Sequence, residues 1–344
     1  MGYNQAFVPG AFAQQVSPLA EFIVGNSLRK LARKHSWLRS ALWRIDYVMI
    51  SAMIFLFKLL PVDTASRLGE RVGSWIGPRL RRKHEIFRDN MSIAFPHLTD
   101  EELELLVTHA WGKAGRVLAE YPHLETILHD DKRLDIVVLE PVETYSNPDK
   151  PCVMVAPHLS NWEVIASAMA RMGIPNASLY SPPTNPLLDE KLLASRRALD
   201  CELLPRDNSS RLLLRALKQG RTAAMVMDRR VDEGKAVRFF GQDKHSTTIP
   251  ARLALKFNCA LVPARVQRLQ DAHFRVTLYP PVQPGDASAS ESDQAVDMIQ
   301  QVHSLFEDWI TEQPADWFCS KRLWPKGKLQ HNEAAGDAVD SRAA

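Results

Sequence analysis

The sequence is most constrained by residues 153–163 (VMVAPHLSNWE), where an apolar run ends at a proline and a histidine. The apolar run is bounded by prolines on both sides, which favours a short buried strand. A helix is predicted to follow, because Ser160 can cap its N-terminus and Glu163 can complete a capping box. His158 would then lie in the turn between strand and helix, at the carboxyl edge of the sheet, where open α/β folds bind ligands.

From about residue 131 onward, short apolar runs alternate with segments of helical periodicity. Strands are predicted at residues 134–139, 152–156, 177–180, 203–205, 222–227, 261–266 and 274–279, and helices at residues 161–172, 185–199, 209–218, 250–256 and 293–313. This alternation predicts an α/β fold with a mostly parallel central sheet flanked by helices.

The segment before the sheet is apolar over residues 45–60, with one interruption at Lys58. It is shorter than the roughly 20 residues of a spanning helix, so it fits either a buried core helix or a membrane anchor. Basic residues on both flanks favour the anchor, because they suit anionic lipid headgroups. No basic segment precedes an apolar core at the N-terminus, so a cleaved signal peptide is not expected.

Between the apolar segment and the sheet the chain is predicted to be mainly helical, with breaks at Pro96 and Pro122 and a helix start at Thr99. The predicted organisation is a basic N-terminal extension (1–44), a membrane-anchor helix (45–60), a helical subdomain (61–130), an α/β domain (131–328) and a disordered tail (329–344).

The composition excludes some classes of function. Lys and Arg number 43 and Asp and Glu 40, and a formal net charge of +3 argues against a nucleic-acid binder. The four cysteines form no CxxC pair, which is typical of reduced thiols in the cytosol. No Cys/His cluster has the spacing of zinc ligands, so a zinc site is not expected.

The candidate catalytic pair is His158 with Glu163, the imidazole acting as general base and the carboxylate orienting it. A capping acid beside an ordinary turn histidine is the alternative. Two later strands end in charged residues, Arg206 after one and Asp228-Arg229 after the other. Arginines at the same sheet edge as a base suggest a phosphate or carboxylate in the substrate, although each could also be a solvated loop charge.

The segment 157–163 resembles the H-x4-D/E motif of glycerolipid acyltransferases, and its setting is most similar to the bacterial lipid A biosynthesis acyltransferases of the late, lauroyl/myristoyl type. Further blocks agree in order: NMSIAFP (90–96), NPLLD (185–189), LPR (204–206), RALKQG (215–220), Asp228, IPARLA (249–254), DW (316–317) and KRLW (321–324). The sequence departs from the family at Arg229, where Gln or His is common, and at Lys321-Arg322-Leu323, where a histidine and two arginines are usual.

The resemblance implies transfer of a fatty acyl chain from an acyl carrier protein thioester to a hydroxyl of a lipid A precursor, without a cofactor or a covalent acyl-enzyme. It implies catalytic roles for His158 and Glu163. Substrate-binding roles are implied for Arg206, Asp228, Arg229 and Arg252. The expected partners are acyl carrier protein and a membrane lipid, and the expected location is the cytoplasmic side of the bacterial inner membrane.

Several alternatives stay open at the level of sequence. The same motif serves acyltransferases for a lysophospholipid, a glycolipid or an aminolipid. An esterase or thioesterase could use His158 and Glu163 to activate water, although no GxSxG nucleophile elbow is present. A lipid-binding protein without activity is a further possibility. The carrier protein, being acidic, is expected to dock on basic residues: Lys191, Arg196, Arg197, Arg211, Arg215 and Lys218.

Overall fold

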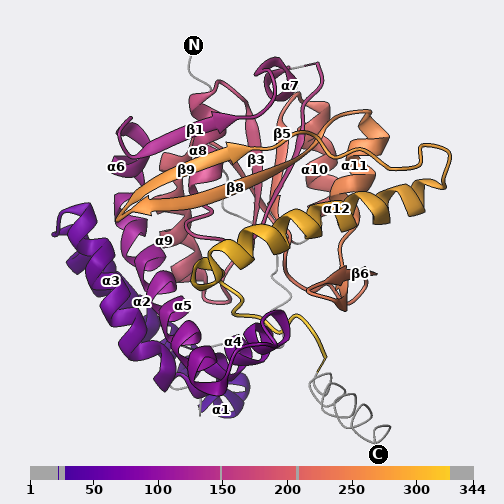
Figure 1. Cartoon of the computed structure of the whole chain (residues 1–344). Helices are drawn as coiled ribbons and strands as arrows, with labels where there is room; N and C mark the ends of the chain where they lie inside the picture. The colour runs from indigo at the N-terminus through magenta and orange to yellow at the C-terminus, as the bar shows by residue number, and fades with distance from the viewer. Residues whose placement is uncertain (1–21, 23–27, 148, 207–208, 326–344) are drawn as a thin grey trace, which may run out of the picture. The chain divides into compact units, whose positions relative to one another are not determined.

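The predicted strands form one seven-stranded sheet in the order β1-β9-β8-β2-β5-β3-β4 in the computed structural model of the chain (Figure 1). The strands are β1 (Leu134–Val138), β2 (Val153–Ala156), β3 (Asn176–Tyr180), β4 (Glu202–Pro205), β5 (Thr222–Val226), β8 (Leu261–Gln270) and β9 (His273–Leu278). Every neighbouring pair is parallel except β8 with β9. The predicted α/β class with a mostly parallel sheet is therefore confirmed.

Helices cover both faces of the sheet, which explains why β2 is apolar without alternation. Val153 and Val155 face a core shared with α10 (Ser209–Lys218), α11 (Ile249–Phe257) and α12 (Glu291–Glu312). Met154 and Ala156 face a second core, which is shared with α6 (Leu124–His129) and α8 (Val164–Arg171). All four side chains are at most 3% exposed.

The helices that precede the sheet are α3 (Val62–Ile76), α4 (Arg81–Ala94), α5 (Asp100–Glu120) and α6, with short 3-10 turns η2 (Gly77–Arg79) and η3 (Tyr121–His123). The predicted start at Thr99 is confirmed: its side chain accepts a hydrogen bond from the Glu102 amide, and the Glu102 carboxylate accepts one from the Thr99 amide. The chain leaves helical geometry before Pro96, as predicted, and passes through η3 at Pro122.

A close approach of backbones joins α3 to α5. A Cβ placed on Gly69 would lie 2.5 Å from the carbonyl oxygen of Gly115, and one on Gly73 would lie 2.3 Å from that of Trp111. Only glycine allows this distance between the two helix axes, so this face of α3 is committed to α5.

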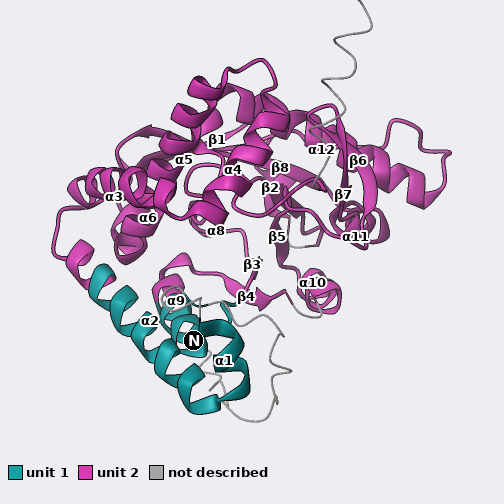
Figure 2. Ribbon diagram, turned by 90° about the horizontal axis from the view of Figure 1, so that it is seen from below, with its two compact units in different colours: residues 1–53, 182–194 teal, residues 54–181, 195–344 magenta. Residues whose placement is uncertain are grey.

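The structure divides into two units, residues 1–53 with 182–194 and residues 54–181 with 195–344 (Figure 2). It describes residue 22 and residues 28–147, 149–206 and 209–325; the predicted tail at 329–344 lies outside these residues. In the first unit lie α1 (Arg29–Lys34), most of α2 (Ser36–Lys58) and most of α9 (Pro186–Arg196).

The apolar segment predicted at residues 45–60 belongs to the longer helix α2. With 23 residues and a mean hydropathy of 1.5 in its most apolar window, α2 is long and apolar enough to cross a membrane. Only 17% of that window is buried, whereas a core helix of a soluble protein is mostly buried. Length, composition and exposure are therefore all compatible with a membrane-associated helix.

A hairpin of β6 (Lys235–Phe239) and β7 (Gln242–Ser246) lies outside the main sheet and was not predicted from the sequence. Its buried positions are Val237, Phe239, Lys244 and Ser246. A lysine at an inward position breaks the apolar alternation by which a half-buried strand is recognised.

Candidate active site

The loop after β2 is held by the C-terminal segment of the chain. The Ser160 amide donates to the Asp316 carbonyl (2.9 Å), the Phe318 amide donates to the His158 carbonyl (2.8 Å), and Leu159 forms a β-bridge with Trp317. The predicted helix start at residue 161 with a Ser160–Glu163 capping box is therefore wrong. Ser160 has φ of 54°, and α8 begins at Val164 without a side-chain cap, because residues 158–160 pair with the C-terminal segment instead.

His158 and Asp228 form the central pair of the site. Nδ1 of His158 lies 2.5 Å from Oδ1 of Asp228, and Nε1 of Trp317 donates to Oδ2 of the same carboxylate (2.9 Å). The pairing follows from the sheet, because β2 and β5 are parallel neighbours with Ala156 opposite Val226. Two residues beyond those positions, both side chains lie at the same carboxyl edge.

The electrostatics suit a neutral base beside an ionised acid. Burial lowers the pKa of His158 below its ordinary value, the Asp228 carboxylate opposes that shift, and the Arg229 charge adds to it. Burial acts to raise the pKa of Asp228, but His158, Lys244 and Trp317 outweigh it and hold that pKa below its usual range. An ionised carboxylate only accepts hydrogen bonds, so Nδ1 carries the proton and Nε2 keeps its lone pair.

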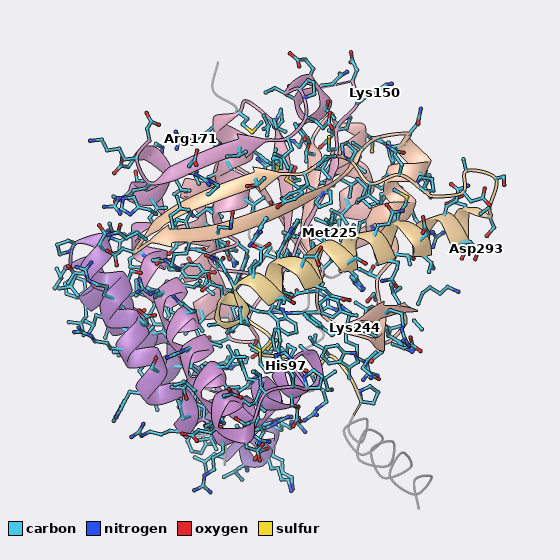
Figure 3. The ribbon with its side chains drawn as sticks, viewed as in Figure 1. His97, Lys150, Arg171, Met225, Lys244 and Asp293 are labelled. Atoms are coloured by element: carbon cyan, nitrogen blue, oxygen red, sulfur yellow. The ribbon has the colours of Figure 1, made fainter. Side chains whose placement is uncertain are left out.

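A buried lysine, Lys244, contacts the backbone of Asp228. Lys244, on β7, is 1% exposed, and its Nζ donates to the Asp228 carbonyl oxygen (2.7 Å) and lies 4.3 Å from the centre of the Phe239 ring. Burial lowers the pKa of this ammonium to about 7. Figure 3 shows Lys244 on the β6–β7 hairpin, so this hairpin supplies a cation beside the acid.

Glu163 has partners other than the expected one. Its carboxylate accepts hydrogen bonds from the Tyr121 hydroxyl (2.6 Å) and from Nε of Arg196 (3.0 Å), and the Nη2 group of Arg196 also contacts it. The hydrogen bond to His158 that the sequence suggested for Glu163 is made by Asp228. Glu163 still acts on His158 through space, since its charge raises the pKa of the imidazole. Arg196, considered above as a docking residue, is buried in this cluster.

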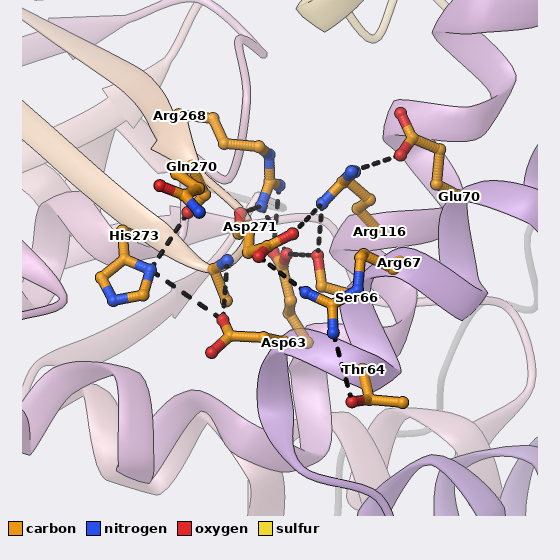
Figure 4. Close-up of polar contacts among 12 residues, drawn as sticks. Asp63, Thr64, Ser66, Arg67, Glu70, Arg116, Arg268, Gln270, Asp271 and His273 are labelled. Carbon is orange, nitrogen blue, oxygen red and sulfur yellow. Dashed lines mark hydrogen bonds and ion pairs between the residues drawn. The ribbon is translucent and has the colours of Figure 1, made fainter.

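Asn161, in the same loop as His158, belongs to a buried polar network. Glu120 is fully buried at the end of α5 and accepts hydrogen bonds from Ser66 (2.6 Å), Asn161 (2.9 Å) and Arg268 (2.5 Å). Figure 4 shows the neighbouring contacts around Arg116 and Arg268. Asn161 is thereby tied to α5, which restrains the loop that carries His158.

His158 lies in the wall of a cavity of about 370 Å³. Its lining is largely apolar, from β2, β3, β4, β5 and the helices α8 and α10: Met154, Ile165, Leu179, Leu203, Leu213 and Met225. The polar side chains of His158, Glu163, Arg206 and Arg229 also line the cavity. An apolar cavity with a few convergent polar groups is the usual form of a small-ligand site.

The three predicted arginines differ in position. Arg206 and Arg229 line the cavity, and neither side chain has a hydrogen-bond or ion-pair partner among the described residues. Burial lowers the pKa of Arg229, and the nearby Arg206 charge adds to this effect, while Asp228 opposes it. Arg252, by contrast, is exposed on α11 and does not line the cavity.

Among the described residues, no group of three or more His, Cys, Asp or Glu side chains is arranged to hold a metal ion. The groups at the cavity are a base (His158), a carboxylate (Glu163) and three arginines (Arg196, Arg206 and Arg229), and Asp228 contacts the base. They can remove a proton from a bound hydroxyl or water and bind an anionic group beside it.

Comparison with known proteins gives a consistent assignment. Residues 32–326 match the family described as bacterial lipid A biosynthesis acyltransferase. A lipid A biosynthesis acyltransferase of Haemophilus influenzae is 24% identical over 291 residues, covering 82% of this chain and 87% of that protein. The lipid A biosynthesis palmitoleoyltransferase of Escherichia coli is 24% identical over 179 residues, 51% of this chain and 58% of that protein.

A phosphatidylinositol mannoside acyltransferase of Mycobacterium tuberculosis is also similar, with 24% identity over 221 residues, 61% of this chain and 67% of that protein. The names of these relatives share acyl transfer to a lipid and differ in the lipid. With the family match spanning most of the sequence, the chain belongs to the bacterial lipid A biosynthesis acyltransferase family, enzymes that transfer acyl groups.

Proposed function

We propose that the protein transfers a fatty acyl chain from an acyl carrier protein thioester to a hydroxyl of a lipid A precursor, at the cytoplasmic side of the bacterial inner membrane. The observation that carries the proposal is that His158, whose Nδ1 lies 2.5 Å from Oδ1 of Asp228, lines a largely apolar cavity. Family membership supplies the class of reaction.

His158 is the general base in this proposal. Nε2 accepts the proton of the acceptor hydroxyl while the hydroxyl oxygen attacks the thioester carbonyl carbon. The carbon–sulfur bond of the tetrahedral intermediate then breaks, and the thiolate takes the proton from the imidazolium. Asp228 orients the ring through Nδ1 and stabilises the imidazolium that forms between the two steps.

Glu163 is assigned to the catalytic machinery as a positioning residue. Its bonds to Tyr121 and Arg196 fix the start of α8, and its negative charge favours the protonated form of His158. This assignment keeps Glu163 important for turnover without a direct contact to the imidazole.

The remaining groups bind the two substrates. Arg206 and Arg229 are proposed to hold a phosphate of the acceptor or the oxygen that becomes negative during attack, because guanidinium groups suit both. The apolar wall formed by β3, β4 and α10 is proposed to hold the acyl chain. Arg252 is proposed to contact the acceptor further from the reacting atoms, since it lies on the exposed face of α11.

A second acceptor class has specific support. The similarity to an enzyme named for phosphatidylinositol mannoside favours a phosphorylated glycolipid as the alternative to a lipid A precursor. Both acceptors combine a hydroxyl with a phosphate, so the same residues serve either one.

The decisive experiment compares purified wild-type protein with His158→Ala, using acyl carrier protein thioester and each acceptor in turn. Loss of the base is expected to lower the rate by about 10²- to 10⁴-fold. The matched control is His129→Ala, which replaces an exposed histidine whose Nδ1 contacts the Glu125 carbonyl, and it should keep full activity. Full activity of His158→Ala with every acceptor would exclude this mechanism.

A further inference from the structure

The corner formed by α3, η2 and the start of α4 exposes apolar and basic side chains together. Trp75 is 62% exposed, Leu80 47%, Ile76 41% and Leu68 39%. We propose that this surface, residues 68–82 (hereafter the α3–α4 corner), docks on the anionic headgroup layer of a bilayer. The inference rests on the proposed function, because a lipid acceptor is what would require a bilayer at this surface. The exposure and charge of the side chains do not depend on that function.

The packing of α3 determines which side chains face outward. Gly69 and Gly73, four residues apart, lie on the face that contacts α5. Leu68, Arg71 and Trp75 have the i, i+3, i+7 spacing of one helix face. That face points away from α5, so no packing inside the unit accounts for its exposed tryptophan.

The exposed charges of the corner are all positive, because its one acidic residue, Glu70, is only partly exposed and pairs with Lys113 and Arg116. Arg71, Arg79, Arg81 and Arg82 are exposed, and the sequence from residue 71 to residue 84 contains no Asp or Glu. These four guanidinium groups have no carboxylate partner among the residues that the structure describes. Elsewhere in the same unit several exposed arginines, such as Arg67, Arg215 and Arg275, are paired with acids, whereas the corner brings together four without a described acidic partner within twelve residues of sequence.

The mixture of side chains favours a bilayer over a soluble acidic partner. The Arg79 guanidinium lies 4.4 Å from the centre of the Trp75 ring, so an aromatic ring and a cation are presented together. Tryptophan is enriched where apolar chains meet headgroups, and basic residues are attracted to the anionic leaflet surface. The cations can bind phosphates while the apolar side chains enter the headgroup layer.

The corner is connected to the active site through aromatic rings. On the buried side of α4, Phe87 packs on Phe318 with ring centroids 5.7 Å apart. Phe318 stacks on Trp162 (5.6 Å), and Trp162 contacts the His158 ring edge-on (4.9 Å). A bilayer bound at the start of α4 would therefore lie against the helix whose buried side packs on the wall of the site.

The test uses the full-length protein and vesicles of phosphatidylcholine with increasing fractions of phosphatidylglycerol. The corner variant Arg81→Glu/Arg82→Glu is compared with Arg211→Glu/Lys218→Glu, an equal charge change on two exposed residues of α10. We expect partition of the corner variant to be at least about tenfold weaker at high phosphatidylglycerol, and partition of the α10 variant to match the wild type.

Hydrogen exchange supplies a local readout that α2 cannot mask. Amides of residues 71–84 should exchange more slowly when anionic vesicles are added, in the wild type and in His158→Ala alike. Wild-type partition of the corner variant together with unchanged exchange at 71–84 would overturn the proposal. It would equally be overturned if the corner variant kept vesicle binding and lost binding to acyl carrier protein. Because His158→Ala should bind vesicles while losing acyl transfer, failure of this proposal and failure of the proposed function are distinguishable.

Discussion

The chemistry of the site depends on which acid His158 contacts. Sequence spacing pointed to Glu163, five positions away, and the structure shows Asp228, seventy positions away. The H-x4-E motif is a local signal, but a hydrogen-bond partner is chosen by the order of the strands. The adjacency of β2 and β5 is a long-range property, which periodicity and capping patterns do not contain.

Replacing Asp228 by Asn tests its role at the scale of one residue. The amide keeps the shape of the side chain but removes the charge that stabilises the imidazolium, so kcat should fall about 10²- to 10⁴-fold. KM for both substrates should change little, because Asp228 contacts the base and not the substrate. Steady-state kinetics on Asp228→Asn measure this, with the exposed Asp232→Asn as control; a large rise in KM with unchanged kcat would assign Asp228 to binding instead.

The pH dependence of kcat/KM reports on the same pair. Activity requires neutral His158, and burial together with the Arg229 charge lowers the pKa of this imidazole. In the pH profile of kcat/KM, the loss of activity on the acidic side is therefore expected below about pH 6.5, the ordinary pKa of histidine. Arg229→Gln removes a positive charge, which raises the pKa of His158 and moves this loss of activity to higher pH. Histidine NMR titration of both proteins checks the assignment, and a shift to lower pH would contradict it.

Some of the site could be identified from residue types alone. His158, Arg206 and Arg229 were predicted because each follows an apolar strand, and the structure brings all three to one cavity. Asp228 was noticed for the same reason but given a role in substrate binding. Lys244 was missed, because a lysine in a charged segment usually faces solvent.

At the scale of elements, most strands and helices after residue 131 were predicted within about two residues. The sequence signals failed where another segment supplied the partners. The start of α8 was misplaced because residues 158–160 pair with Asp316–Phe318 and Ser160 has φ of 54°, which is not the backbone conformation of an N-cap. The β6–β7 hairpin was missed because its inward positions include Lys244.

The hairpin is expected to act through Lys244. Lys244→Met keeps the length of the side chain but leaves the buried carbonyl oxygen of Asp228 without a donor, which costs about 1–3 kcal/mol of unfolding free energy. Urea denaturation measures this cost, and Lys235→Met, at an exposed position of β6, should change stability by less than about 0.5 kcal/mol. Equal stabilities of the two variants would contradict the role assigned to Lys244.

The stability difference should also depend on pH. The native pKa of Lys244 is about 7, whereas lysine in an unfolded chain has a pKa of about 10.4. Between these values the unfolded state binds more protons, so raising the pH stabilises the wild type through this group. Lys244→Met lacks this contribution, so the wild type should gain stability relative to the variant over that interval.

At the scale of the whole molecule, α2 and the α3–α4 corner would provide two different kinds of membrane contact. Removal of residues 1–60 deletes α2 and is expected to release most of the protein from the membrane fraction. The remainder, held by the arginines of the corner, should dissociate in high salt, because exposed charges are screened there. Fractionation in low and high salt measures both effects, with circular dichroism confirming the fold. Unchanged sedimentation in high salt would refute the anchoring role of α2.

The pairing of residues 158–160 with Asp316–Phe318 has a consequence for biosynthesis. The ribosome makes the loop that carries the base well before it makes the segment that holds this loop. Until then the Asp228 carboxylate lacks its hydrogen bond from Trp317, and the backbone of residues 158–160 lacks its hydrogen bonds to Asp316 and Phe318. A nascent chain therefore cannot assemble the acid and base in their working geometry. Acyl transfer therefore requires that Asp316–Phe318 have been made and have paired with this loop.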